Sequence, residues 1–385
     1  MTADAAVRGI RKVDPGGSVG LISAELDPPY NRPPLTKDLW KGKPIEKIWR
    51  KTETRGVELY LGRCVKAIDP QNKSVMDEQE TVYTFEKLLL ATGGAPRRFP
   101  FDTGQIIYFR TLEDYRRLRA LTEKGQRFAV IGGGFIGSEI AAALAMNEKK
   151  VVLILRNEGI GYHVFPHDLS LFLNDFYREK RVEVLAGESP IDVEKRGDQL
   201  ALKTRNIKTL QEKEILVDGV VAGLGIEPNI ELAQAAGLEV GNGIRVDDFL
   251  RTNHPDIYSA GDVANFYNPA LGERIRVEHE DNANTMGRFA GQSMAGEPVP
   301  YHHLPYFYSD LFELGYEAVG DLNSQLETVA YWKEPYREGV IYYLRNGRIR
   351  GVLLWNVWEQ VDEARKLIAE AGPFSPEDLK ECLPI

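Results

Sequence analysis

Cysteine is scarce in this 385-residue sequence, which contains only Cys64 and Cys382. Because no C-x-x-C pair is present, the sequence carries neither a dithiol redox motif nor a zinc framework, and we expect two reduced thiols and no metal site. Long apolar runs are missing too, since none reaches the roughly 18 residues of a membrane-spanning helix. No signal peptide can be recognised. The sequence therefore predicts a cytoplasmic protein without a membrane span.

An excess of positive charge is also absent. The chain has 57 acidic and 48 basic residues, which gives a formal net charge of −9. That balance argues against a general nucleic-acid binder or a protein of acidic membrane surfaces. No repeat at a solenoid period and no low-complexity tract interrupts the chain. With 43% hydrophobic and 27% charged residues, the sequence predicts a globular protein of two or three domains.

The most informative stretch runs from Phe128 to Arg156. A short apolar run is followed by three glycines spaced as G-x-G-x-x-G, which are Gly132, Gly134 and Gly137. A helical pattern and a second apolar run, Val151 to Leu155, complete the unit. Strand, glycine turn, helix and strand in this order are the context that a dinucleotide-binding fingerprint requires.

Each of the three glycines has a physical role in such a fingerprint. Gly132 permits the tight turn, Gly134 lets the backbone approach a pyrophosphate, and Gly137 lets the helix pack close to the strand. The helix N-terminus then offers free N–H groups and a positive dipole end to the phosphates. An isolated glycine pattern also occurs in ordinary loops, but the complete flanking pattern favours a nucleotide site.

The start of the chain has half of a second unit of this kind. Ala3 and Ile10 belong to a helical pattern, and Val19 to Ser23 predicts a strand after the Asp-Pro-Gly-Gly turn. A chain that simply begins with a helix is the alternative. We expect instead that the first strand and its glycine turn precede Met1, in roughly 7–12 further residues on the lengths of such units.

Three further segments present chemistry-bearing residues. The proline-rich loop from Arg32 to Trp40 is stiff backbone that carries Arg32 and Lys37. The strand Phe85–Leu90 ends in small residues, where backbone can approach a ligand. A strand near 256–259 ends in Ala-Gly-Asp before an expected helical stretch, and Asp262 could bind a hydroxylated ligand or cap that helix. From Tyr301 onward, aromatic residues, strands and a final helix at 357–371 predict a separate α+β domain.

Several motifs together carry a resemblance to a known family. They are RPPLTKDLW (32–40), FEKLLLATGGAPR (85–97), VIGGGFIGSE (130–139), VVAGLGIEPNIELA (220–233), YSAGDVANFY (258–267), RVEHEDNA (276–283), YSDLFELGYEAVG (308–320) and VLLWNVW (352–358). On these motifs the chain resembles the bacterial apoptosis-inducing factor-like FAD/NAD(P)H oxidoreductases. This family lies in the ferredoxin-reductase-like branch of the pyridine nucleotide-disulfide oxidoreductase superfamily.

The resemblance implies an α/β fold with two Rossmann-like dinucleotide-binding domains, the second inserted in the first, and a C-terminal α+β domain. The expected boundaries are 1–107 with 240–300 for FAD, 108–239 for NAD(P)H and 301–385 for the last domain. The implied cofactors are FAD and NAD(P)H, with NADH favoured. Hydride would pass from nicotinamide to flavin, and electrons would then pass to a quinone, oxygen or a small redox protein.

Two alternatives stay open at this stage. One is a dedicated ferredoxin or rubredoxin reductase, and the other is a redox-gated binding protein with slow turnover. A homodimer is also allowed. No cysteine pair could serve a disulfide relay of the glutathione-reductase type.

Functional residues carry over from the family motif by motif. Lys37 and Glu139 resemble the family's Lys–Glu pair beside the isoalloxazine ring, and they are the expected catalytic residues. Asp262 would hold the ribityl chain, and His279 with Glu278 would lie near the flavin–nicotinamide contact. The other expected cofactor-binding residues are Glu25, Arg32, Val65, Thr92, Gly93, Gly132, Gly134, Gly137, Glu158 and Gly225. From the residues alone, Glu139 could equally serve the helix dipole, Lys37 could be a solvated charge, and His279 could be a satisfied helix histidine.

The sequence departs from the family pattern at four points. Arg156 stands where relatives often have a ribose-binding acid, so a 2′-phosphate could be accepted there. Glu25 lies one residue later than the expected FAD-domain acid, at whose place Ala24 stands. Tyr308 replaces a tryptophan. The dimer-forming and nuclear-targeting insertions of the animal protein are absent from the last domain, so we expect no cell-death role.

Overall fold

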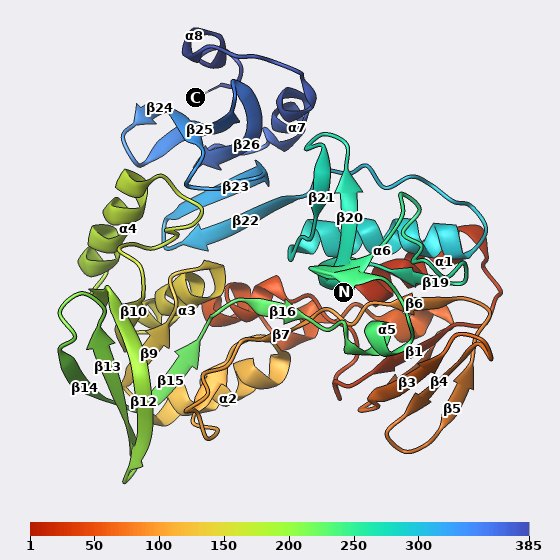
Figure 1. Ribbon diagram of the computed structural model, residues 1–385. Coiled ribbons are helices and arrows are strands. Elements are labelled where there is room, and N and C mark those ends of the chain that lie inside the picture. Colours follow the sequence, from red (N-terminus) through yellow and green to blue (C-terminus); the bar gives the residue numbers. More distant parts are fainter. Residues whose placement is uncertain (385) are drawn as a thin grey trace. The chain divides into compact units, whose positions relative to one another are not determined.

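The computed structural model describes residues 1–384, and the chain divides into two compact units (Figure 1). Unit 1 comprises residues 1–32, 44–95 and 227–307. Unit 2 comprises residues 33–43, 96–226 and 308–385. Each unit is therefore assembled from segments that are far apart in the sequence.

Unit 1 contains three α-helices and short strands in several small sheets. The helices are α1 (Thr2–Val13), α5 (Glu231–Ala235) and α6 (Glu280–Met294). The strands are β1 (Gly20–Ser23), β2 (Glu58–Leu61), β3 (Val65–Asp69), β4 (Ser74–Asp77), β5 (Val82–Thr84), β6 (Leu88–Leu90), β17 (Val240–Gly241), β18 (Gly243–Arg245), β19 (Ile257–Ser259), β20 (Ala264–Asn268) and β21 (Glu273–Ile275). Strands β1 and β2 pair in parallel, as do β6 and β19.

The two long helices of unit 1 pack at very short range because small residues line their contact. A methyl group on Gly291 would lie 2.0 Å from the carbonyl oxygen of Ala6, and one on Gly9 would lie 2.1 Å from that of Arg288. Helix α1 also buries Val7 against Leu21 of β1. The helix and the strand that the sequence predicts for the second half of this βαβ unit are thus α1 and β1.

A buried carboxylate ties α1 to the segment that follows the proline-rich loop. Asp4 is fully buried and accepts hydrogen bonds from Arg50 Nε at 2.7 Å, Thr52 Oγ1 at 2.7 Å and Arg8 Nε at 2.9 Å. Burial alone would raise the pKa of Asp4, but the bonds from Thr52 and Arg50 outweigh it and lower that pKa. Asp4 is therefore an ionised anchor for residues 50–52.

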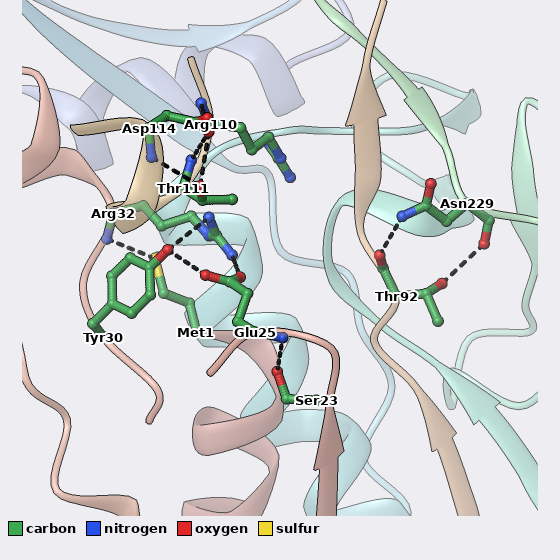
Figure 2. Close-up of polar contacts among 10 residues, drawn as sticks. All are labelled: Met1, Ser23, Glu25, Tyr30, Arg32, Thr92, Arg110, Thr111, Asp114 and Asn229. Carbon is green, nitrogen blue, oxygen red and sulfur yellow. Dashed lines mark hydrogen bonds and ion pairs between the residues drawn. The ribbon is translucent and has the colours of Figure 1, made fainter. Parts of the chain in front are cut away.

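The middle of unit 2 is a five-stranded parallel sheet in the order β11-β10-β9-β15-β8. Its strands are β8 (Ile106–Tyr108), β9 (Arg127–Ile131), β10 (Lys150–Leu155), β11 (Val182–Ala186) and β15 (Gly219–Ala222). Helices α2 (Leu112–Lys124), α3 (Phe135–Met146) and α4 (His167–Glu179) pack on it. Thr111 and Asp114 form a capping box that starts α2 (Figure 2).

An antiparallel sheet covers part of this parallel sheet. It consists of β12 (Glu188–Arg196), β13 (Gln199–Asn206) and β14 (Glu212–Val217). Leu202 and Val217 pack into the same core as Ala129 and Val152 of the parallel strands. Strands β7 (Gly94–Pro96) and β16 (Ile226–Pro228) pair with each other.

The C-terminal part of unit 2 is an antiparallel sheet with the order β22-β23-β26-β25-β24. Its strands are β22 (Tyr306–Leu311), β23 (Leu314–Gly320), β24 (Glu327–Glu334), β25 (Glu338–Arg345) and β26 (Arg348–Trp355). Helix α7 (Val361–Ala369) packs on β23 and β26, and the short α8 (Pro376–Leu379) follows. The mixed α/β fold with two dinucleotide-binding domains and a C-terminal sheet domain, as predicted, is confirmed.

Two helix predictions need correction. The segment after β19 is a single 3₁₀ turn, Gly261–Val263, followed by strand β20, because Gly261 adopts φ +80° and redirects the chain. The final helix starts at Val361 rather than 357. Asn356 adopts φ +51°, and its side chain bonds Gly315 N and Arg337 O, which holds the following residues outside the helix.

No helix within residues 1–384 is long and apolar enough to cross a membrane.

Candidate functional site

The glycine turn after β9 packs closely against neighbouring backbone. Gly132 adopts φ +109°, which favours glycine, and a methyl group there would lie 2.4 Å from the carbonyl oxygen of Gly223. A methyl group on Gly137 would lie 1.9 Å from the carbonyl oxygen of Gly132. By contrast, a methyl group on Gly134 would meet no protein atom within 4 Å. The turn thus packs tightly on one side and leaves open space at Gly134.

Open space at Gly134 coincides with the N-terminus of α3. Gly134 is the N-cap residue, no side chain caps the helix, and no acid occupies its first turn. The amides of that turn are thus left for a ligand, and the helix dipole favours an anion there. These features fit the pyrophosphate of a dinucleotide.

The loop after β10 lies against the glycine turn. Its Gly161 N donates to Gly133 O at 2.8 Å. Glu158 is half exposed and pairs with Lys208 Nζ at 2.8 Å, and this bond lowers the pKa of the Glu158 carboxyl. Arg156 is exposed at the end of the strand. An acid and a base therefore lie two residues apart where the sequence predicts contact with the coenzyme ribose.

The C-terminal sheet holds the same loop from another side. Tyr343 Oη donates to Val164 O at 2.8 Å, and Ser324 N donates to His163 O at 3.1 Å. The Phe165 ring meets Tyr316 edge-on with centroids 5.3 Å apart and Trp355 with centroids 5.5 Å apart. Side chains of the last sheet and the backbone of the turn between β23 and β24 therefore fix the shape of the loop.

Lys37 and Glu139 lie together in unit 2. The Lys37 Nζ is 2.6 Å from Glu139 Oε1, and the two side chains are only 11% and 4% exposed. Thr36 Oγ1 donates to Glu139 Oε2 at 2.5 Å, and Ser309 Oγ donates to Glu139 Oε1 at 2.6 Å. The Lys37 ammonium also lies 5.4 Å from the centre of the Tyr308 ring. The sequence-predicted pair is thus brought together within a larger cluster.

In unit 1, Glu25, Tyr30 and Arg32 are all bonded to one another (Figure 2). The Arg32 guanidinium pairs with Glu25 Oε1 and donates to Tyr30 Oη at 3.2 Å, while Tyr30 Oη donates to Glu25 Oε2 at 2.6 Å. The Arg32 guanidinium also lies 5.1 Å from the centre of the Tyr30 ring. Arg32 is therefore oriented by three contacts.

Thr92 is bound to Asn229 by two hydrogen bonds (Figure 2), and Gly93 is bound to Asn229 as well. Thr92 Oγ1 donates to Asn229 O at 2.9 Å, and Asn229 Nδ2 donates back to Thr92 O at 2.8 Å. Asn229 N donates to Gly93 O at 3.0 Å. These three hydrogen bonds fix the backbone after β6 at the place where the sequence predicts a flavin.

Asp262 and His279 lie within electrostatic reach of each other. Burial lowers the pKa of His279 to about 4, although Asp262 and Asp281 oppose that shift, so the imidazole is neutral at pH 7. Its ring stacks on Phe307 with centroids 4.1 Å apart. Glu278 pairs with Arg276 at 2.7 Å.

The residues of unit 1 also fit a flavin nucleotide. A methyl group on Gly261 would lie 2.3 Å from Thr2 Oγ1, so the segment bearing Asp262 closely approaches the first turn of α1, which no side chain caps. That turn also carries Asp4, whose carboxylate is bound by Arg50 and Thr52, so the uncapped amides and the Asp262 carboxylate match the phosphate and hydroxyl groups of a ribityl pyrophosphate.

Two of the predicted cofactor-binding residues, Val65 and Gly225, make backbone contacts typical of a strand and a turn. Val65 is the first residue of β3 and pairs with Asp77 of β4. Gly225 adopts φ +79° at an exposed turn, and its carbonyl accepts from Arg97 N at 3.1 Å.

The sequence did not single out Thr36, Ser309, Asn229 or Gly223 as site residues. Thr36 and Ser309 stand inside the motifs that carry the family resemblance, directly beside Lys37 and Tyr308. Their neighbours were the only available signal, because nothing in a lone hydroxyl indicates a distant carboxylate.

Comparison with protein families gives two matches. Residues 3–287 match the pyridine nucleotide-disulphide oxidoreductase family. Residues 290–335 and 332–370 match the C-terminal domain of mitochondrion-associated apoptosis-inducing factor. Together these two matches confirm the resemblance that the sequence motifs predict.

Relatives that match over nearly the whole chain support the same family. The chain is 33% identical over 372 residues to the 5,5′-dehydrodivanillate O-demethylase ferredoxin reductase subunit of Sphingobium, covering 94% of this chain and 89% of that protein. It is 34% identical over 420 residues to mitochondrial apoptosis-inducing factor 1 of Dictyostelium discoideum, covering 98% and 77%. The fold matches putidaredoxin reductase, solved in its covalent complex with putidaredoxin, with a TM-score of 0.89, 28% identity and coverage of 98% and 92%.

Proposed function

The chain belongs to the pyridine nucleotide-disulphide oxidoreductase family and is an NAD(P)H oxidoreductase, and we propose on that premise that its electron acceptor is a small iron–sulfur protein. Of the acceptors that the sequence left open, this one is favoured over a quinone or oxygen. The ferredoxin reductase predicted as an alternative thereby becomes the main proposal.

One observation carries the proposal. The chain has two cysteines, Cys64 and Cys382, and both are free thiols. A reductase without a dithiol relay passes electrons from its cofactor to an outside acceptor, which a quinone or oxygen could equally be. The choice of an iron–sulfur protein rests on the Sphingobium relative, named a ferredoxin reductase subunit, and on the matched complex of putidaredoxin reductase with putidaredoxin.

Within unit 1 we assign FAD contacts to Asp262, Arg32, Glu25 and the backbone at Thr92 and Gly93. Bound FAD supplies hydride acceptance and stepwise electron release, which no side chain provides. The chain's own residues would bind the FAD and orient it. Neutral His279 presents a flat, uncharged ring, and Phe307 fixes its plane.

Within unit 2 we assign the coenzyme pyrophosphate to the turn of Gly132, Gly134 and Gly137. Lys37 contributes a positive charge held by Glu139, which would stabilise negative charge developing beside it. We also propose Val65, Gly225, Glu158 and Glu278 as further cofactor contacts on the family motifs.

Finer points are proposals on the same premise. We propose NADH as the donor, since Glu158 offers a carboxylate for ribose hydroxyls. The three-domain division at residues 107, 239 and 300, the homodimer and the cytoplasmic location stay predictions. Sedimentation of the purified protein tests the homodimer directly.

Anaerobic stopped-flow spectroscopy tests the acceptor. The FAD-loaded protein is reduced with NADH and then mixed with a [2Fe–2S] ferredoxin, a rubredoxin, a quinone or oxygen. We expect the ferredoxin to reoxidise the protein at least about tenfold faster than the free quinone or oxygen. Equal or faster reoxidation by the quinone would overturn the proposal.

A second candidate is a redox-gated binding protein. The match of residues 290–370 to the apoptosis-inducing factor C-terminal domain favours it. A charge-transfer band that persists for minutes after NADH addition, with a change in sedimentation coefficient, would support this candidate. Rapid turnover with ferredoxin and an unchanged coefficient would eliminate it.

A further inference from the structure

We propose that Ser309 and Thr36 are positioning residues of the Lys37–Glu139 pair. Their hydroxyl groups bind the Glu139 carboxylate on both oxygens and hold it in the one orientation that presents Lys37. The inference rests on the proposed function, because it assigns roles inside that same site.

Three donors converge on this carboxylate from two distant parts of the sequence. Oε2 accepts from Thr36 at 2.5 Å, and Oε1 accepts from Ser309 at 2.6 Å and from Lys37 at 2.6 Å. The Glu139 side chain is 4% exposed, so water has little access to replace a lost donor. A buried carboxylate that loses one donor pays the desolvation of that oxygen or turns toward another donor.

The hydroxyl direction at Ser309 follows from the neighbouring groups. Tyr316 is fully buried, and its side chain is hydrogen-bonded to that of Ser309. A carboxylate only accepts, and a serine hydroxyl has one proton. Ser309 therefore donates to Glu139 and accepts from Tyr316. Burial, and then the Glu139 charge, raise the pKa of Tyr316, which keeps its own proton available.

This chain of donors begins in a rigid aromatic group. The Tyr316 ring stacks on Trp355 with centroids 5.6 Å apart and an interplanar angle of 8°, and it meets Phe165 of the loop after β10. A rotation of the Glu139 carboxylate would have to break the bond to Ser309. The C-terminal sheet thereby fixes the direction of an ion pair that begins in the proline-rich loop.

The simpler reading is that both hydroxyls only satisfy a buried charge and stabilise the fold. The two readings differ in what their removal does to flavin reduction. A positioning role predicts a slower reduction at unchanged NADH affinity, whereas a purely structural role predicts a lower stability with an unchanged rate.

The chain offers a matched control for each variant. Ser309→Ala and Thr36→Val remove the two donors. Ser293→Ala and Thr204→Val remove hydroxyls that are also buried but have no hydrogen-bond partner within the described residues. Ser309→Thr keeps the hydroxyl and serves as the rescue variant.

The first measurement is the anaerobic rate of flavin reduction over a range of NADH concentrations. We expect the limiting rate of Ser309→Ala and of Thr36→Val to fall about tenfold or more, the size of one hydrogen bond to a charged group. The NADH dissociation constant should stay within about twofold. Ser309→Thr and both controls should keep the rate within about twofold of the wild type.

The second measurement needs no cofactor. In FAD-free protein, urea midpoints are compared for Ser309→Ala, Glu139→Ala and the double variant. If the hydroxyl binds the carboxylate, the shift of the double variant is smaller than the sum of the single shifts. Additive shifts would show that the two side chains do not interact.

The outcomes separate this inference from the proposed function. A wild-type protein that NADH fails to reduce would defeat the proposed function, and additive midpoints would defeat the contact alone. Normal reduction rates in both hydroxyl variants, with non-additive midpoints, would leave only a structural role and overturn the positioning.

Discussion

A methyl group on Gly137 would lie 1.9 Å from the carbonyl oxygen of Gly132, whereas one on Gly134, three residues earlier, would touch no protein atom. The three glycines of this motif therefore have different structural roles. Gly132 and Gly137 let the turn and helix α3 pack together. Gly134 leaves room for a ligand at the N-terminus of the helix.

The first prediction compares two substitutions in that turn. Gly137→Ala should destabilise the protein by roughly 1–3 kcal/mol or more, because an added methyl overpacks the contact with Gly132. Gly134→Ala should leave the melting temperature nearly unchanged, since its φ of −81° suits alanine, but should weaken NADH binding about tenfold or more. Calorimetry and NADH titration check both. Equal effects of the two variants on both readouts would contradict the assignment.

The second prediction concerns the buried ion pair. Lys37→Ala or Glu139→Ala alone leaves a buried charge without its partner, so each should cost roughly 3–5 kcal/mol in the free energy of unfolding. The double variant should cost less than the sum and should slow flavin reduction non-additively. Urea denaturation and stopped flow check this. The exposed pair Lys43–Asp38 is the control, with an expected effect within about 1 kcal/mol.

The third prediction concerns Asp4, which anchors residues 50–52 to helix α1. Asp4→Ala should lower the free energy of unfolding by roughly 3–5 kcal/mol, because Arg50 is 8% exposed and would lose its buried partner. Arg8→Ala removes a partner that is 41% exposed and should cost less than about 1 kcal/mol. The measurement is urea unfolding of the two variants. Similar midpoints would show that Asp4 does not anchor residues 50–52.

The fourth prediction concerns pH. His279 has a folded-state pKa of about 4 against about 6.5 in an unfolded chain, so the unfolded state binds the extra proton between these values. Stability is therefore lost as pH falls from about 6.5 toward 4, by up to about 3 kcal/mol. His279→Gln should lack this loss. Parallel stability–pH curves for the two proteins would refute the neutral imidazole.

The fifth prediction concerns coenzyme choice. Arg156→Ala should lower kcat/KM for NADPH about tenfold relative to NADH, because the variant removes the cation that the sequence predicts to accept the 2′-phosphate. Arg196→Ala changes the net charge equally from a more distant strand, where Arg196 pairs with Glu214, and should leave the ratio unchanged. If Arg156→Ala also leaves it unchanged, Arg156 does not select the coenzyme.

Local patterns predicted the nucleotide-binding unit well. The apolar runs, the glycine spacing and the helical repeat between Phe128 and Leu155 correspond to β9, α3 and β10, because each signal lies within a few residues of the structure it causes. The predicted start of the final helix was wrong, because a distant contact rather than a local pattern decides where that helix begins. The apolar pattern from Val357 continues into α7, but bonds from Asn356 to distant strands override it.

At the candidate site, too, features set by local sequence could be predicted and contacts between distant residues could not. The proline-rich loop could be recognised as stiff and positively charged, but its partner could not. Lys37 and Glu139 were paired through family resemblance rather than spacing. Ser309 is 170 residues from the carboxylate that it binds, and no local pattern reports a contact of that kind. Only the assembled sheet of the C-terminal region places its hydroxyl there.

The bonds from Tyr343 and Ser324 to the loop after β10 bear on protein engineering. A coenzyme-binding module transplanted from this chain without its last sheet would lose the two donors that hold Val164 and His163, and also the rings that enclose Phe165. A chimera that exchanges residues 96–226 should therefore carry residues 308–384 from the same parent, or reproduce those contacts in the recipient. The natural unit of exchange is the pair of segments rather than the Rossmann domain alone.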